Sequence, residues 1–319
     1  MTRGFLLGKF MPPHAGHQLL VETALGLVDE LTVLVCWLPD DPIPGPLRVA
    51  WMRELFPRAR IVEHGAPVPQ APQEHAHFWP IWRGIVRGAH PEPIDLVFAS
   101  ESYGNRLAQE VGARAVLVDP ERAIIPISAS EIRADPMTHW RCLPSVVRHY
   151  FARTICLHGP ESTGKSTLAP RLARHFGTNF VPEYGRTFCQ QHGLDLTMTD
   201  LVEIGRTHAA ITQAALHRCD RRLILDTDPL MTAVWADMLF GTRDPWFDRF
   251  EATADLYLLL DIDMPWVDDG TRYFGRALER QRFFDLSRAE LDRRGLPYVV
   301  IGGTPEERFA RAVDVIGRL

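Results

Sequence analysis

The chain contains 319 residues, 46% hydrophobic and 24% charged, which is typical of a globular protein large enough for two domains. A formal net charge of -5 without any basic block argues against binding to nucleic acid by charge alone, and no apolar run approaches the roughly 20 residues that span a membrane. Five cysteines without metal-binding spacing favour reduced thiols. We therefore expect a cytoplasmic protein with no nucleic-acid partner and no membrane insertion.

Short apolar runs alternate with helical patterns in the first half of the chain. The predicted strands cover residues 4–8, 31–38, 59–65, 95–100 and 113–119. The predicted helices cover residues 17–30, 46–56, 77–88 and 103–112. Such alternation is typical of a parallel sheet with helices on both faces.

The pattern begins again after a helical stretch, residues 137–152, that Pro144 interrupts. Strands are predicted over residues 153–159, 179–185, 222–228, 256–263 and 297–303, and helices over residues 165–177, 199–218 and 229–241, with a last helix capped by Thr304. The sequence therefore predicts two doubly wound α/β domains with parallel sheets, residues 1–150 and 151–319. Their ligand sites are expected at the carboxyl ends of the strands.

A phosphate-binding loop, G-x-x-x-x-G-K-S, follows the first predicted strand of the second domain. Its glycines allow backbone N–H groups to surround phosphates at the start of a helix. Lys165, one of only two lysines in the chain, is expected to reach the β- and γ-phosphates, and Ser166 to bind Mg²⁺. The predicted ATP-binding residues of this loop are Gly159, Glu161, Ser162, Thr163, Gly164, Lys165, Ser166 and Thr167.

Carboxylates end two later strands of the same domain. Glu183 follows one strand, and Asp226 and Asp228 follow another. An apolar strand that runs into carboxylates is typical of a site that organises Mg²⁺ or supplies a general base. For Asp228, which precedes Pro229, the cap of a helix is an equally good interpretation.

Arginines gather near the end of the chain, behind a loop that contains Gly270. Arg276 and Arg280 are four residues apart and would share one face of a helix. This spacing suits a lid that closes arginines over a transferring phosphoryl group. A solvated basic face is the alternative.

Two histidines stand at the entrance of the first predicted helix, in GKFMPPHAGH. His14 and His17 flank Gly16, which permits a close backbone approach. Two imidazoles and the amide dipoles of a helix N-terminus form a site suited to phosphate charge.

The segment ISASEIR follows the last predicted strand of the same domain. Ser128 or Ser130 can cap a helix that presents Arg133 to the same edge of the sheet. Ser128 and Glu131 alone would make an ordinary capping box, and such a box can coexist with a role in phosphate binding.

Together, G-x-F-x-P-x-H-x-G-H and I-S-x-S-x-x-R resemble the paired signature of the nucleotidyltransferase superfamily. With SESYG in the first domain and EYGR, DTD and PWVDDGTR in the second, nearly the whole chain resembles the NadR-type family, which joins a nicotinamide mononucleotide adenylyltransferase to a ribosylnicotinamide kinase. Ser130 stands where the family often has threonine, and it keeps the hydroxyl. Some members carry an N-terminal helix-turn-helix repressor domain, whereas this chain starts at the first predicted strand, so we expect no operator binding.

The resemblance implies a C-terminal P-loop kinase domain that phosphorylates ribosylnicotinamide with ATP. Asp226 would be the base or the Mg²⁺ partner, and Lys165, Arg276 and Arg280 would stabilise charge on the phosphoryl group. The ribosylated nicotinamide ring is cationic and should attract an aromatic face. The implied substrate-binding residues are Glu183, Arg186, Asp228, Trp266, Asp269 and Arg272.

The resemblance also implies an N-terminal Rossmann-like nucleotidyltransferase domain. It would join nicotinamide mononucleotide to a second ATP, with Mg²⁺ and without a covalent enzyme intermediate, and so form NAD and pyrophosphate. The implied ATP-binding residues are Gly8, Lys9, Phe10, His14, His17, Ser128, Ser130 and Arg133, with His14, His17 and Arg133 in catalysis. Trp82 is a candidate for the nicotinamide ring, and Glu101 and Tyr103 are candidates for contacts to a nucleotide.

Two other interpretations remain open. One is an adenylyltransferase and kinase fusion that acts on another mononucleotide. The other is a nucleotide sensor without significant turnover that signals to a partner, such as a nicotinamide-riboside transporter. The sequence also leaves open a homo-oligomer.

Overall fold

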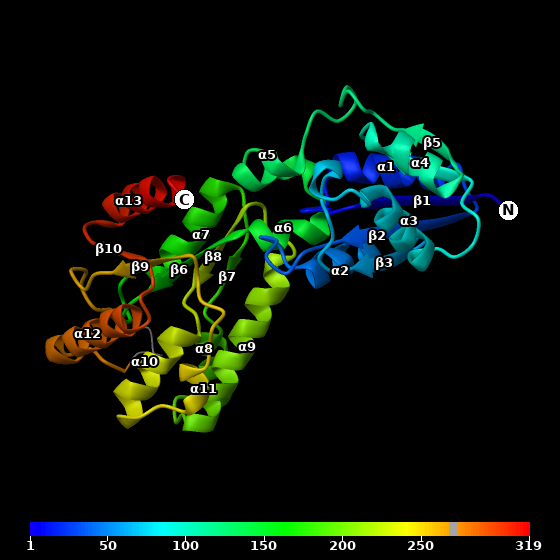
Figure 1. The fold of residues 1–319 in the computed structure, drawn as a ribbon. Helices are drawn as coiled ribbons and strands as arrows, with labels where there is room; N and C mark the ends of the chain where they lie inside the picture. Colours follow the sequence, from blue (N-terminus) through cyan, green and yellow to red (C-terminus); the bar gives the residue numbers. More distant parts are fainter. Residues whose placement is uncertain (268–272) are drawn as a thin grey trace. The chain divides into compact units, whose positions relative to one another are not determined.

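The computed structural model describes residues 1–267 and 273–319, and the chain separates into two compact units, Met1–Tyr150 and Phe151–Leu319 (Figure 1). Asp269 and Arg272, two of the expected substrate-binding residues, lie outside the described residues. Each unit contains a five-stranded parallel sheet with helices on its faces, which confirms the predicted fold class. No helix of the described part is long and apolar enough to cross a membrane.

The first unit has the strand order β3-β2-β1-β4-β5. Its strands are β1 (Arg3–Gly8), β2 (Glu30–Cys36), β3 (Arg60–His64), β4 (Leu96–Ala99) and β5 (Arg114–Leu117). Its helices are α1 (Ala15–Leu25), α2 (Gly45–Leu55), α3 (Phe78–Ala89), α4 (Tyr103–Val111) and α5 (Ala129–Ala134), with α6 (Ser145–Phe151) at the boundary between the units. Because the chain winds from β1 toward β3 and then resumes at β4, the strand order reverses at β1, where open α/β sheets bind ligands.

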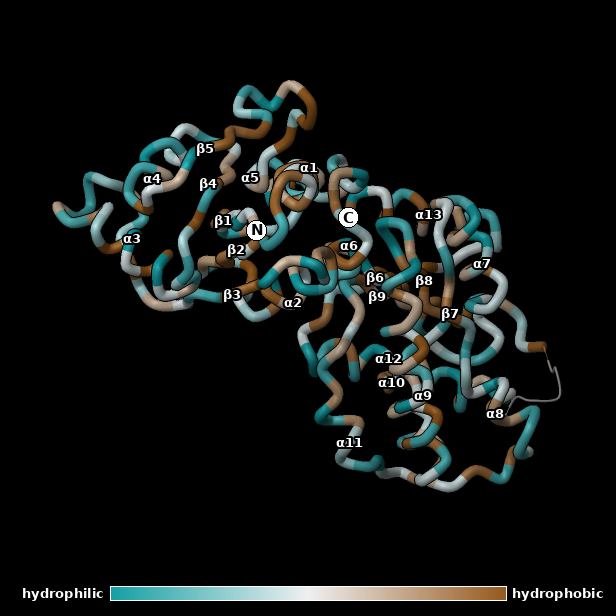
Figure 2. The backbone as a smooth tube through the Cα atoms, turned by 90° about the vertical axis from the view of Figure 1, so that its right-hand side faces the viewer, coloured by the Kyte–Doolittle hydropathy of each residue, from teal (hydrophilic) through white to brown (hydrophobic). Residues whose placement is uncertain are grey.

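Successive residues of each strand face opposite sides of this sheet. Leu6 and Val33 pack against α1 and α2, whereas Phe5 and Leu34 pack against α3 and α4. Figure 2 shows hydrophobic residues along the strands of the sheet. Two buried faces explain why the strands appear in the sequence as apolar runs rather than as alternating patterns.

The second unit has the strand order β10-β9-β6-β8-β7. Its strands are β6 (Arg153–His158), β7 (Phe180–Val181), β8 (Arg222–Asp226), β9 (Leu256–Leu260) and β10 (Tyr298–Ile301). Its helices are α7 (Lys165–Phe176), α8 (Tyr184–His192), α9 (Met198–Leu216), α10 (Pro229–Phe240), α11 (Pro245–Asp248), α12 (Ala277–Arg293) and α13 (Pro305–Gly317). Strand β6 lies in the middle, so the loop that follows it emerges at the centre of the sheet.

Helices cover both faces of the second sheet. Leu157 packs with Leu172 of α7 and Ile316 of α13 on one face. Cys156 packs with Leu230 of α10 and Leu291 of α12 on the other. The short helices α8 and α11 were not predicted from the sequence. Each has fewer than three turns, so its apolar pattern is too short to stand out.

Candidate active sites

The phosphate loop joins the end of β6 to the start of α7. Gly159 and Gly164 have φ angles of 121° and 88°, and a Cβ at Gly159 would lie 2.8 Å from the carbonyl oxygen of Leu260, so a side chain is excluded there. The Nζ of Lys165 donates hydrogen bonds to the carbonyl oxygens of Gly159 (2.8 Å) and Pro160 (2.7 Å). The ammonium group therefore lies inside the curve of the loop.

Asp226 lies directly beside this loop because β8 pairs with β6, with Asp226 opposite Leu157. Burial raises the pKa of its carboxyl, while the charge of Lys165 and a hydrogen bond with Ser166 lower it. The Oδ1 atom of Asp226 is buried and has no hydrogen-bond partner among the residues that the structure describes. An oxygen with free lone pairs is thus held next to the Ser166 hydroxyl.

Glu183 belongs to the same electrostatic group. It immediately precedes α8, and burial raises the pKa of its carboxyl, as does the nearby charge of Asp226, whereas Lys165 lowers it. Arg186, three residues further along, has its Nε 3.9 Å from a Glu183 carboxylate oxygen. The ammonium of Lys165 therefore acts on the carboxyls of both Asp226 and Glu183.

Asp228 has a structural role as the N-cap of α10. Its Oδ1 accepts hydrogen bonds from the backbone N–H groups of Leu230 (3.0 Å) and Met231 (3.3 Å), and its Oδ2 accepts one from the Tyr257 hydroxyl (2.6 Å). Burial raises the pKa of this carboxyl to about 6. Of the two interpretations that the sequence allowed for Asp228, the geometry therefore favours the helix cap.

A cavity of about 400 Å³ opens beside the phosphate loop. Glu183 and Arg186 line one part of it, and His208, Trp235 and Tyr273 line another. The rings of Trp235 and Tyr273 have their centroids 5.6 Å apart. The cavity therefore combines a phosphate-binding wall with an aromatic wall, which suits a phosphate acceptor that carries a flat ring.

His208 is a buried neutral group in this cavity. It lies in α9 with 1% of its surface exposed, and burial lowers its pKa to about 4. Its Nε2 has no hydrogen-bond partner within residues 1–267 and 273–319. His208, Trp235 and Tyr273 could not be identified from the sequence, because their positions in apolar helical patterns or beside a loop are equally typical of packing.

The chain on both sides of residues 268–272 is fastened to the phosphate loop. The Ser162 hydroxyl accepts a hydrogen bond from Val267 N (2.8 Å), and the Glu161 carboxylate accepts hydrogen bonds from Tyr273 N (3.0 Å) and Phe274 N (2.9 Å). These contacts place Tyr273 beside the nucleotide loop. They also give Glu161 and Ser162 a role in holding this segment.

The arginines of the expected lid differ in their surroundings. Arg276 is exposed immediately before α12, whereas Arg280 in the first turn donates a hydrogen bond to the Met264 carbonyl oxygen (2.9 Å). Arg280 therefore ties α12 to the segment that leads toward residue 267. The described structure places neither guanidinium on the wall of the cavity.

The turn after β1 in the first unit carries the two expected histidines. His14 is the N-cap of α1, and its Nδ1 accepts a hydrogen bond from the backbone N–H of Gly16 (3.1 Å). A Cβ at Gly16 would lie 3.0 Å from the His14 ring, so glycine lets the ring approach the helix. Because Nδ1 accepts, the proton of the neutral ring lies on Nε2.

The ISASEIR segment meets this turn. Ser128 and Glu131 form a capping box at the start of α5. Arg133 in the same helix donates hydrogen bonds to the Ser130 hydroxyl (3.2 Å) and to the Met11 carbonyl oxygen, which belongs to the turn after β1. Both segments therefore lie side by side at the carboxyl edge of the sheet.

Arg122 adds positive charge to this site and was not identified from the sequence. Burial is the largest cause of the lowered pKa values of His14 and His17, and the positive charge of Arg122 lowers both further. Its guanidinium lies 3.7 Å from the carboxylate of Glu101. Lys9 is held differently, since its Nζ lies 3.4 Å from Asp41, which also pairs with the buried Arg48.

Comparison with known proteins extends over the whole chain. The AAA domain family matches residues 154–308. The trifunctional NAD biosynthesis/regulator protein NadR of Escherichia coli (strain K12) is 30% identical over 338 residues, which cover 99% of this chain and 82% of that protein. The chain belongs to the NadR family. This result confirms the resemblance inferred from the motifs.

Two solved NadR structures share the fold of the chain. One is a NadR protein in complex with NR, with a TM-score of 0.83, and the other is a NadR protein in complex with NAD and AMP-PNP, with a TM-score of 0.80. Both are 22% identical to this chain and cover 99% of it and 95% of their own chains. The arrangement of strands and helices is therefore that of NadR in both units.

Three expected site residues of this NadR-family chain have packing roles in the structure. Trp82 is buried against the sheet, and its indole N–H donates to the Pro69 carbonyl oxygen (3.0 Å). The Tyr103 hydroxyl donates to the Leu7 carbonyl oxygen (3.1 Å), which ties α4 to the end of β1. The Trp266 ring packs against Gly275, where a Cβ would approach it to 3.3 Å.

Proposed function

We propose that this NadR-family chain makes NAD from ribosylnicotinamide in two ATP-dependent steps, one in each unit. The NadR complexes with NR and with NAD and AMP-PNP support these substrates, and AMP-PNP is an analogue of ATP. The observation that carries the kinase step is the convergence of Lys165, Ser166 and Glu183 on one cavity with an aromatic wall, with Asp226 close behind Lys165 and Ser166.

In the kinase step, the 5′-hydroxyl of ribosylnicotinamide attacks the γ-phosphorus of ATP. Asp226 accepts the hydroxyl proton, for which its position beside Lys165 and its raised pKa are suitable. Lys165 stabilises the charge of the transferring phosphoryl group. Glu183 and Arg186 bind the ribose hydroxyls from their wall of the cavity.

The same site fits Mg²⁺. The hydroxyl of Ser166 is an oxygen ligand of the kind that Mg²⁺ prefers. Asp226 Oδ1, which is buried without a partner in the described structure, would be a second ligand if Asp226 binds the ion instead of acting as the base. When bound, Mg²⁺ neutralises charge on the phosphates. ATP and Mg²⁺ would thus meet at the start of α7.

The aromatic wall binds the nicotinamide ring. The ring of ribosylnicotinamide is cationic, and a cation near the face of an aromatic ring is favoured by about 0.5–2 kcal/mol. Trp235 and Tyr273 are therefore better candidates than Trp266, which packs against Gly275. We therefore propose Trp235 and Tyr273 for the nicotinamide ring in place of Trp266, which the sequence suggested.

In the adenylyltransferase step, the phosphate of nicotinamide mononucleotide attacks the α-phosphorus of ATP, and pyrophosphate leaves. His14 donates a hydrogen bond from Nε2, since its Nδ1 is engaged with Gly16. Arg122 and Arg133 supply positive charge for the phosphates. His17 supports the His14 ring by packing against it.

Turnover measurements test this proposal. The protein is incubated with ribosylnicotinamide, ATP and Mg²⁺, and ADP, pyrophosphate and NAD are measured over time. We expect all three products. Consumption of a different mononucleotide without NAD would favour the fusion with another substrate, and binding without ADP or pyrophosphate would favour the nucleotide sensor. Cytoplasmic localisation, a homo-oligomer and a link to a transporter stay predictions from the sequence.

A further inference from the structure

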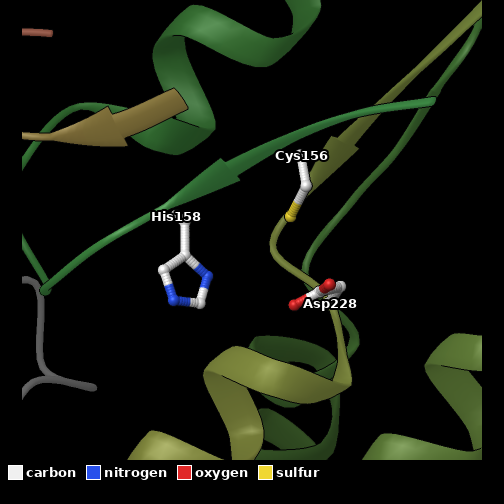
Figure 3. A group of neighbouring side chains, drawn as sticks. All are labelled: Cys156, His158 and Asp228. Atoms are coloured by element: carbon white, nitrogen blue, oxygen red, sulfur yellow. The ribbon is translucent and has the colours of Figure 1, made fainter. Parts of the chain in front are cut away.

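Three side chains with metal-binding atoms meet beneath the phosphate loop: Cys156, His158 and Asp228 (Figure 3). Cys156 and His158 are two residues apart in β6, so both point to the same face of the sheet. Asp228 stands at the start of α10, just after β8, which pairs with β6. One potential ligand atom from each side chain lies within 4.8 Å of those of the other two.

His158 is the group that most needs a ligand. The side chain is fully buried, and neither ring nitrogen makes a well-formed hydrogen bond among the described residues, although the Ser287 backbone lies close enough to act on the ring. Burial and the charge of Lys165 lower its pKa to about 3, although Glu290 and the backbone of Ser287 oppose the shift. The imidazole is therefore neutral, and a buried imidazole without a well-formed hydrogen bond is unfavourable unless something binds it.

Asp228 is already oriented as a ligand would be. The helix N–H groups of Leu230 and Met231 hold its Oδ1, and the Tyr257 hydroxyl holds its Oδ2. A carboxylate has about four lone-pair directions, and these three donors take three of them. The Cys156 thiol also hydrogen-bonds to this carboxyl, and that hydrogen bond is released when the thiol loses its proton to bind the ion. Hydrogen bonds of this kind are typical around the ligands of protein metal sites.

We propose that Cys156, His158 and Asp228 bind one zinc ion. A thiolate, an imidazole and a carboxylate are ligands that zinc accepts, whereas Mg²⁺ prefers oxygen alone, so the site differs chemically from the one at Ser166 and Asp226. Because zinc–ligand bonds are about 2.0–2.3 Å long, the three side chains need to close by about 1 Å.

The charges balance in this arrangement. Cys156 loses its thiol proton to solvent when the ion binds, so the thiolate and the carboxylate of Asp228 together neutralise the two positive charges of zinc. A neutral assembly enters a buried environment at far lower cost than a lone charge. Burial raises the pKa of the Cys156 thiol without the ion, so binding is expected to weaken as the pH falls.

The ion would join the end of β6 to the start of α10. The first of these elements leads into the phosphate loop, and the second carries Trp235 of the cavity wall. The site therefore has a structural role in the second unit, and its existence does not depend on which substrate the cavity binds.

Cobalt substitution tests the site in the full chain. The protein is produced in medium that contains Co²⁺ in place of zinc, and the metal content and the near-ultraviolet absorbance are measured. We expect one cobalt per chain with a sulfur-to-cobalt charge-transfer band, which an oxygen-only site at Ser166 and Asp226 does not produce. The absence of this band in the folded wild-type protein would overturn the proposal.

Variants assign the ligands. Cys156→Ser is expected to remove the band and His158→Gln to remove or shift it, whereas the matched control Cys219→Ser, in the same unit and not one of the three clustered side chains, keeps it. A band that persists in folded Cys156→Ser contradicts the proposal. If that variant does not fold, zinc is removed from the zinc-loaded wild type with a chelator and the unfolding temperature is measured. We expect the unfolding temperature to fall. An unchanged unfolding temperature after zinc removal would contradict the proposal.

Discussion

The imidazole of His17 packs against that of His14, with 3.8 Å between the ring centroids and the ring planes tilted by 37°. Phe10 meets His17 edge to face at 4.9 Å. Burial is the main cause of the lowered pKa values of both histidines, and the charge of Arg122 adds to it. Both rings are therefore neutral near pH 7, so the positive charge at this turn comes from Arg122 and Arg133.

The stability of the first unit is expected to fall between about pH 6.5 and pH 4. The pKa of His14 is lowered from 6.5 to about 4 in the folded chain, so in this range the unfolded state binds more protons and stability rises with pH. The full shift corresponds to about 3 kcal/mol. Denaturant unfolding of wild type and His14→Gln at pH 7 and pH 4.5 measures this. Equal loss of stability in both proteins would rule out His14 as the cause.

Arg122→Ala is expected to slow adenylylation of supplied nicotinamide mononucleotide by about 100-fold, because it removes positive charge from the phosphate site. The kinase rate should not change, since Arg122 belongs to the first unit. Glu101→Gln is the matched control, because it removes the ion-pair partner and leaves the guanidinium in place. A full adenylylation rate in Arg122→Ala would show that this charge is not used.

The two activities should separate by mutation. Lys165→Ala is expected to abolish the kinase step and to leave adenylylation of supplied mononucleotide, because Lys165 lies within the phosphate loop of the second unit. His17→Ala is expected to abolish adenylylation and to leave the kinase step. Separate assays of ADP and pyrophosphate release measure both effects. Loss of both activities in either folded variant would contradict independent sites.

Substitution of Asp226 should mainly lower the kinase rate, whereas substitution of Asp228 should mainly lower the stability of the folded chain. Asp226→Asn is expected to lower the kinase kcat by at least about 100-fold without loss of stability, because it removes the proposed base and a buried charge. Asp228→Ala removes the cap of α10 and should cost about 1–2 kcal/mol of stability, with a smaller effect on kcat. Kinetics combined with denaturant unfolding separate the two outcomes. Reversed effects would assign the base to Asp228.

Features that depend on adjacent residues could be predicted from the sequence. The phosphate loop needs only a strand, two glycines and a helix start, so its eight-residue pattern specified Lys165 and Ser166. The strands of both sheets were also predictable, because burial on two faces leaves long apolar runs. The site of the first unit followed from two motifs on loops at one edge of a sheet.

Features that depend on distant parts of the chain could not be predicted. Trp235 and Tyr273 come together from α10 and from the segment after residue 272, and neither position carries a motif. Arg122 lies in an irregular loop and acts through charge on residues far away in sequence. Trp82 and Trp266 were ambiguous from sequence alone, since a tryptophan at a helical or loop position packs as readily as it binds a ligand.

The identity of the aromatic wall can be decided by a pair of tryptophan variants. Trp235→Leu is expected to raise the KM for ribosylnicotinamide by about tenfold, because the loss of a cation–π contact of about 1–2 kcal/mol weakens binding of the cationic ring. The KM for ATP should change little, because the loop backbone and Lys165, and not Trp235, are the proposed phosphate-binding groups. Trp266→Leu is the matched control, because it makes the same substitution at a ring packed on Gly275. Initial rates over a range of concentrations of both substrates measure these constants. A larger KM for ribosylnicotinamide in Trp266→Leu than in Trp235→Leu would show that Trp266, the tryptophan suggested by the sequence, binds the nicotinamide ring.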